Sequence, residues 1–136
     1  MGISIYFWVA LGGALGSMGR YWMGLRIATM TGLAFPWATI LINILGSLAI
    51  GFLARFTGPE GRFPIPLDVR TFLIVGLCGG FTTFSAFSLQ TLILAREGRW
   101  LLAGANILLS VALCLAAVAL GYWIATLFRR SGVGTG

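Results

Sequence analysis

The sequence predicts an all-α integral membrane protein with four membrane-spanning helices, the third of which is broken near its middle. The chain of 136 residues is 59% hydrophobic and only 9% charged, whereas about a quarter of a soluble domain is charged. Four long stretches carry almost no charged side chains, and the third contains a glycine- and threonine-rich segment, GLCGGFTTFSAFSLQ, at residues 76–90. We expect one four-span membrane domain over residues 1–128 and a basic, glycine-rich tail over residues 129–136.

The first predicted span covers residues 3–19, with no basic residue before it, so we expect no cleaved signal peptide. Gly12 and Gly16 form a G-x-x-x-G pair, which lets two membrane helices approach closely. Arg20 follows after a stretch that is short for a span. Two positions remain open for Arg20: a vestibule inside the edge of the membrane, or the lipid headgroup region, which its side chain would reach by snorkelling.

The second predicted span begins at Trp37, after a short loop over residues 29–36, and runs to residue 54. Thr39, Asn43 and Ser47 are four residues apart and therefore share one helix face. A buried amide is costly in a membrane unless it is paired. This face is expected to look toward a water-filled path, or else to hydrogen-bond a neighbouring helix.

The third predicted span covers residues 71–95, after a hydrophilic loop at residues 57–67. Glycine destabilises a helix, and paired glycines often kink one, so we expect the helix to open near residues 79–83 and expose carbonyl oxygens. The alternative is that these glycines only allow another helix to pack closely.

The fourth predicted span, residues 100–128, follows a tight turn at residues 96–99. It carries a second polar stripe, because Asn106, Ser110 and Cys114 are also four residues apart.

The charged residues exclude several classes of function. The three acids, Glu60, Asp68 and Glu97, lie in loops or at span ends, and the chain has no histidine. Proton-coupled pumps and cation pathways typically use a carboxylate inside the membrane, and an ATP-driven pump would need a phosphate-binding loop. We expect no enzyme, and no nucleic-acid partner, because the arginines are scattered and suit lipid headgroups instead. The remaining amides, hydroxyls and phenylalanine ring edges can solvate an anion.

The arginines also predict how the chain inserts into the membrane. Four spans place both termini and the loop between the second and third spans on one side of the membrane, and this side carries five of the nine arginines. The other side, with the loops between the first and second and between the third and fourth spans, carries four. The positive-inside rule gives almost no preferred orientation for such a distribution. We therefore expect dual topology, with two copies pairing antiparallel as a closed homodimer.

Three segments of the chain resemble the Fluc (CrcB) fluoride channels: GGFTTFSAFS in the third span, TILINILGS in the second and GALGSMGRYW in the first. The resemblance implies a dual-topology antiparallel homodimer with two fluoride pores, in the plasma (inner) membrane of a bacterium or archaeon. It also implies passive fluoride efflux that protects the cell from fluoride toxicity. A structural sodium ion (Na+) is implied at the dimer centre, bound by the backbone carbonyls of Gly79 and Thr82 from each subunit.

The same resemblance assigns individual residues. Asn43 matches the pore asparagine, and Phe84 and Phe87 match two phenylalanines whose edges face fluoride. The remaining expected pore residues are Thr39, Ser85 and Ser110, and Arg20 is the expected vestibule residue. The chain departs from the family at two positions, with Ala86 where a hydroxyl is usual and Gln90 where a glutamate is frequent.

Two other functions stay open at this point. One is a small proton-coupled exporter of the multidrug-resistance type, which the absence of a carboxylate within the spans disfavours. The other is a membrane scaffold without transport, which the two polar stripes disfavour.

Overall fold

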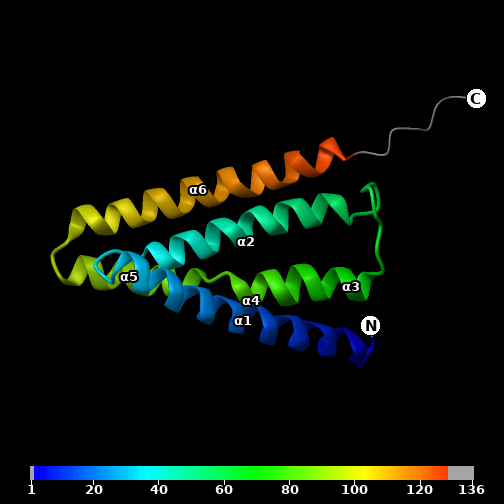
Figure 1. The fold of residues 1–136 in the computed structure, drawn as a ribbon, viewed down its shortest axis with the longest axis horizontal. Coiled ribbons are helices and arrows are strands. Elements are labelled where there is room, and N and C mark those ends of the chain that lie inside the picture. Colours follow the sequence, from blue (N-terminus) through cyan, green and yellow to red (C-terminus); the bar gives the residue numbers. More distant parts are fainter. Residues whose placement is uncertain (1, 129–136) are drawn as a thin grey trace, which may run out of the picture.

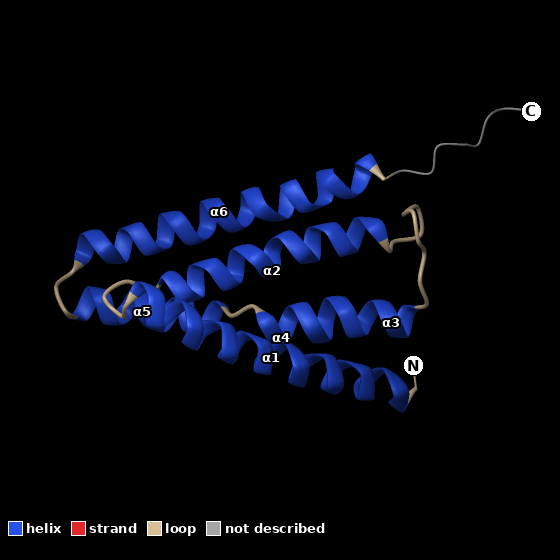
Figure 2. Ribbon diagram, viewed as in Figure 1, coloured by secondary structure: helices blue, strands red, loops and turns tan. Residues whose placement is uncertain are grey.

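The apolar stretches fold into long helices that run side by side in alternating directions (Figures 1 and 2). The structure is a computed structural model and describes residues 2–128, so the predicted tail at residues 129–136 lies outside the described residues. Helix α1 spans Ile3–Thr31, α2 spans Trp37–Phe56 and α6 spans Trp100–Leu127. Between α2 and α6 lies a segmented stretch made of α3 (Leu67–Thr71), η1 (Phe72–Cys78), α4 (Gly79–Phe81) and α5 (Phe84–Arg96).

Three of these segments are long and apolar enough to cross a membrane: Trp37–Phe56, Leu67–Arg96 and Trp100–Leu127. Helix α1 has 29 residues, which corresponds to a length of about 43 Å at 1.5 Å per residue. Its glycines and its two arginines, Arg20 and Arg26, make it less apolar than the other three. The described chain is thus an all-helical membrane protein, and a crossing by α1 remains a prediction.

Helix α1 is longer than the sequence indicated. The expected loop at residues 29–36 is wrong at its start, because the helix continues to Thr31. Arginine is a good helix former, so Arg20 and Arg26 do not interrupt the helix. Gly32 ends it with a positive φ of 76° and donates its N–H to the carbonyl of Ala28.

Glycines bring α1 against the third segment. A Cβ atom at Gly12 would lie 2.5 Å from the carbonyl oxygen of Phe72, and one at Gly16 would collide with the carbonyl of Leu77. The close approach predicted from the G-x-x-x-G pair is therefore confirmed. Gly76 and Gly80 face α1 in the same way, against Gly12 and Gly13.

Helices α2 and α6 pack along much of their length (Figure 1). Gly51 meets the carbonyl of Val118, and Gly121 meets the carbonyl of Leu48, each so closely that a side chain there would collide with the facing backbone. The bundle therefore consists of two closely packed pairs, α1 with η1 and α4, and α2 with α6.

The third segment departs from regular α-helix in two places. Residues Phe72–Cys78 form a π-helix, a conformation that is rare and often found near functional sites. Thr82 (φ −84°, ψ 157°) and Thr83 (φ −152°, ψ 111°) then have extended backbones between α4 and α5. Gly79 keeps helical angles (φ −63°, ψ −39°), so the two non-helical residues are threonines.

Candidate functional site

An open cleft of about 340 Å³ lies where α2, α5 and α6 meet the two extended threonines. It is formed by side chains from both polar stripes together with aromatic and aliphatic residues. Its lining residues are Asn43, Ser47, Ile50, Thr82, Thr83, Phe84, Phe87, Ser110, Val111, Cys114 and Leu115. The lining contains no aspartate, glutamate, histidine, lysine or arginine, so the polar groups that the cleft offers are mainly amides, hydroxyls and backbone groups.

Asn43 holds the extended backbone in place. Its Nδ2 atom donates to the carbonyl of Thr83 at 3.0 Å, and its Oδ1 atom accepts from the N–H of Thr83 at 2.8 Å. One amide side chain thus satisfies both backbone groups of a residue that has left the helix. A backbone group without a partner is costly in a membrane, which explains why an amide faces this point. An amide nitrogen carries two hydrogens, so the second N–H of Asn43 is not needed for this pair.

The side chain of Thr83 starts the next helix. Its Oγ1 atom accepts from the N–H of Ala86 at 3.1 Å, which is the usual N-cap bond. The same oxygen lies 3.2 Å from Oγ of Ser85. Thr83 therefore joins the polar side chains of this turn to the Asn43 amide.

The α6 side of the cleft rests on a buried polar network. Ser110 donates to Oδ1 of Asn106 at 3.3 Å, and Nδ2 of Asn106 donates to Oγ1 of Thr91 at 2.8 Å. Thr91 in turn donates to the carbonyl of Phe87 at 2.8 Å. Asn106 is only 1% exposed, and these bonds fix the orientation of the Ser110 hydroxyl at the cleft.

Phe84 and Phe87 lie together on one face of α5, as their spacing predicted. Their ring centroids are 5.2 Å apart and the ring planes are inclined by 52°. Phe87 is 8% exposed, whereas Phe84 is 76% exposed. Ring edges carry the positive part of the aromatic quadrupole, and tilted rings can present an edge to an ion in the cleft.

Arg20 contacts the third segment just before the extended threonines. Its Nε atom donates to the carbonyl of Gly80 at 3.1 Å, and Ser17 donates to the same oxygen at 3.4 Å. The side chain of Arg20 thus reaches the middle of the third segment, while its depth in the membrane, vestibule or headgroup region, stays a prediction. It is not among the residues that line the cleft.

The carbonyl oxygens of residues 79–82 lose their usual helical partners where the helix is interrupted, and the carbonyl of Gly80 accepts from Arg20 and Ser17 instead. In a continuous α-helix the N–H of Thr83 would bond Gly79, and the N–H of Ala86 would bond Thr82. The first N–H bonds Asn43 instead, and the second bonds the Thr83 hydroxyl. Gly79 is exposed on the surface of the protomer. The carbonyls of Gly79 and Thr82, the expected sodium ligands, are thus released from these bonds.

Four of the predicted pore residues line the cleft together: Asn43, Phe84, Phe87 and Ser110. Ser85 contacts Thr83 from an exposed position, and Thr39 is buried at 7% exposure; neither lines the cleft.

Sequence reasoning missed two features of the site. The backbone of Thr83 is the partner of Asn43, and Thr91 supports Asn106. Thr91 lies four residues after Phe87, so helical spacing was the signal available for it.

Comparisons with known proteins agree over nearly the whole chain. Residues 7–122 match the family described as "CrcB-like protein, Camphor Resistance (CrcB)". A relative from Paramagnetospirillum magneticum named "Fluoride-specific ion channel FluC" is 55% identical over 125 residues, which cover 92% of this chain and 98% of the relative. Relatives with the same name from Rhodospirillum rubrum (57% identical; 92% of this chain, 97% of the relative) and Opitutus terrae (51%; 88% and 91%) are similarly close.

Proposed function

Because the chain belongs to the CrcB family, we propose that it is a fluoride-specific ion channel that lets fluoride leave the cell passively and so confers resistance to fluoride. The observation that carries this function is the identity of 55% over 98% of a relative named as a fluoride-specific channel. Multi-pass insertion in the inner membrane of a bacterium is the corresponding location.

The chemistry of the cleft supports conduction of an anion. Fluoride is small and strongly hydrated, so its path must replace water with several donors at close range. The spare N–H of Asn43 and the edges of Phe84 and Phe87 supply such groups, and the Ser110 hydroxyl would add another by turning from Oδ1 of Asn106 toward the ion. Since the lining contains no arginine or lysine, binding stays weak enough for the ion to leave.

The active form in this proposal is an antiparallel homodimer with dual topology. The nearly even distribution of arginines supports it. So does the exposure of Phe84, an aromatic cleft residue that is 76% exposed in the single protomer.

A structural sodium ion belongs to the same proposal. Two released carbonyls per protomer, those of Gly79 and Thr82, would give four oxygen ligands on the two-fold axis. Oxygen is the ligand type that a hard cation prefers. The ion would act by holding the two interrupted helices together, and Asn43 would keep the carbonyls free by occupying the N–H of Thr83.

The other two candidate functions gain nothing from the structure. A proton-coupled exporter needs a titratable group on its path, and the cleft lining contains no carboxylate or histidine. A protein that serves only as a membrane scaffold would not require polar residues to gather at one cleft.

Efflux from liposomes tests the function. Purified protein is reconstituted in liposomes loaded with potassium fluoride at neutral pH, and an electrode records external fluoride. A passive channel should release fluoride only when valinomycin lets potassium follow, without any pH gradient, and should release far less chloride. Protein-free liposomes are the control. Efflux that requires a proton gradient, or equal efflux of chloride, would contradict the proposal.

A further inference from the structure

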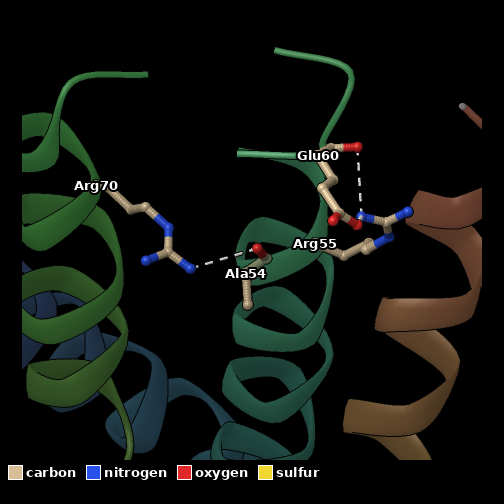
Figure 3. A network of polar contacts seen from close by, with 4 residues as sticks. All are labelled: Ala54, Arg55, Glu60 and Arg70. Carbon is tan, nitrogen blue, oxygen red and sulfur yellow. Dashed lines mark hydrogen bonds and ion pairs between the residues drawn. The ribbon is translucent and has the colours of Figure 1, made fainter. Parts of the chain in front are cut away.

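A second cleft, of about 240 Å³, lies at the end of the bundle where α2 ends and α3 begins. It is lined by Ala54, Arg55, Gly58, Pro59, Glu60, Arg70 and Tyr122. It shares no residue with the cleft between α2, α5 and α6. Figure 3 shows the side chains of Arg55 and Arg70 on either side of the end of α2.

Arg70 has unused hydrogen-bonding capacity. Its only side-chain hydrogen bond within residues 2–128 is a long one, from an Nη atom to the carbonyl of Ala54 at 3.4 Å. The Nε atom is buried and has no partner in the same part of the chain. A buried N–H of a charged group without an acceptor is costly, so this guanidinium is suited to an anionic ligand.

Arg55 is paired only weakly. Its side chain is 17% exposed, and an Nη atom lies 3.9 Å from a carboxylate oxygen of Glu60, whose own side chain is 90% exposed. The same nitrogen donates to the backbone carbonyl of Glu60 at 3.4 Å (Figure 3). Such an ion pair contributes little because water screens it. The cleft therefore holds two guanidinium groups against one solvated carboxylate, a net positive charge.

The position of the cleft identifies the anion. The ends of α2 and α6 and the start of α3 lie together at one end of the bundle (Figure 1), which is a membrane boundary for segments that span the bilayer. Arg55 also lies 6.0 Å from the ring centroid of Tyr122, a residue type enriched at the headgroup level. The phosphate of a phospholipid is the abundant anion at this depth.

We propose that this cleft binds the headgroup phosphate of an anionic phospholipid, with Arg70 and Arg55 donating to its oxygens. Guanidinium groups bind phosphate through paired, charge-assisted hydrogen bonds. Exposed apolar side chains in the last turns of α6, the helix that supplies Tyr122 to the cleft, offer a surface for the acyl chains: Trp123 is 58% and Leu127 is 64% exposed. Free phosphate would gain nothing from that surface, so the lipid is the favoured source.

Native mass spectrometry of the purified full-length protein tests the site. The protein is incubated with phosphatidylglycerol or with phosphatidylcholine of the same acyl chains, and retained lipid is counted. We expect preferential retention of phosphatidylglycerol, reduced roughly fivefold by each of Arg55→Gln and Arg70→Gln, the step expected for one arginine beside an anionic lipid surface. Arg62→Gln is the matched control. Arg62 lies in the loop between α2 and α3 with its guanidinium over the ring of Phe63, and it does not line the cleft.

Glu60→Gln separates binding from folding. The Glu60 side chain is exposed, so its replacement should leave the fold intact and should increase retention of phosphatidylglycerol by removing the competing carboxylate. Equal retention of the two lipids, or unchanged retention in Arg70→Gln and Glu60→Gln, would overturn the proposal. Inorganic phosphate that displaces phosphatidylglycerol at equal concentration would also overturn it, because the site would then be specific for phosphate alone.

Discussion

Replacing Asn43 by leucine removes both hydrogen bonds that hold the extended backbone of Thr83, at 3.0 and 2.8 Å. Leaving a buried donor or acceptor without its partner costs about 1–3 kcal/mol. Thr83 is only partly buried, so we expect Asn43→Leu to lower the free energy of unfolding by about 2–4 kcal/mol for the two groups together.

Two further variants refine this prediction. Asn43→Asp keeps an acceptor for the N–H of Thr83 but turns a carboxylate oxygen toward the Thr83 carbonyl, so it should also destabilise the protein. It additionally places a negative charge beside an anion path and should reduce fluoride flux severely. Ser47→Ala is the control, because Ser47 lines the same cleft and its hydroxyl makes no side-chain hydrogen bond within residues 2–128. Its effect should stay within about 0.5 kcal/mol.

Equilibrium unfolding in mixed micelles of detergent and SDS measures these differences. Tryptophan fluorescence reports the transition, since the chain has five tryptophans. Protein concentration must be held constant, because association of protomers changes the apparent stability. If Asn43→Leu loses no more stability than Ser47→Ala, the Asn43 amide does not hold the interrupted helix and the reasoning fails.

Three other predictions follow from the packing, the ion and the topology. Gly12→Ala should lower stability by about 1–3 kcal/mol through overpacking, whereas Gly13→Ala, whose Cβ would meet nothing within 4 Å, should not; thermal melts that show equal losses would contradict this. Removal of sodium should abolish flux, and Thr82→Ala should keep the site because the ligands are carbonyls. A Cβ at Gly79 would meet only the carbonyl of Ile74, at 3.8 Å. Loss of flux in Gly79→Val would therefore reflect a disturbed contact with the second protomer or the ion rather than a clash within the protomer. Unchanged flux after removal of sodium would refute the site. Added arginines on one side of the membrane should lock the orientation, and two oppositely locked forms should conduct only when co-expressed; a single locked form with full activity would exclude the antiparallel dimer.

The sequence predicted the helical segments well because hydropathy and helix-stop signals act locally. Trp37 and Trp100 begin helices where expected, and Gly98, at a φ of 74°, allows the tight turn before α6. The end of α1 was placed too early, because an arginine was read as the limit of the apolar stretch although it does not end a helix.

Both roles that the sequence left open for the third segment occur in it, at different residues. Gly76 and Gly80 allow close approach of α1, which was the alternative explanation, while the extended residues are Thr82 and Thr83. The partner of Asn43 lies forty residues away, and no local pattern identifies a backbone group as that partner. The π-helix over Phe72–Cys78, which packs against α1, was not anticipated either, because no local pattern in the sequence indicated it.

Fluoride flux through Phe84→Ile in liposomes tests the central claim most directly. Isoleucine keeps an apolar side chain but removes the ring quadrupole, and Phe84 is exposed, so the fold should persist. We expect flux to fall about tenfold, the effect of losing about 1.4 kcal/mol of ion stabilisation. The elution volume in size-exclusion chromatography, which reports the assembly of the protein, should stay unchanged. Phe7→Ile, an exposed phenylalanine on α1 (60% exposed), should conduct as the wild type does. If Phe84→Ile also conducts fluoride at the wild-type rate, the ring only packs and the ions do not pass along this cleft.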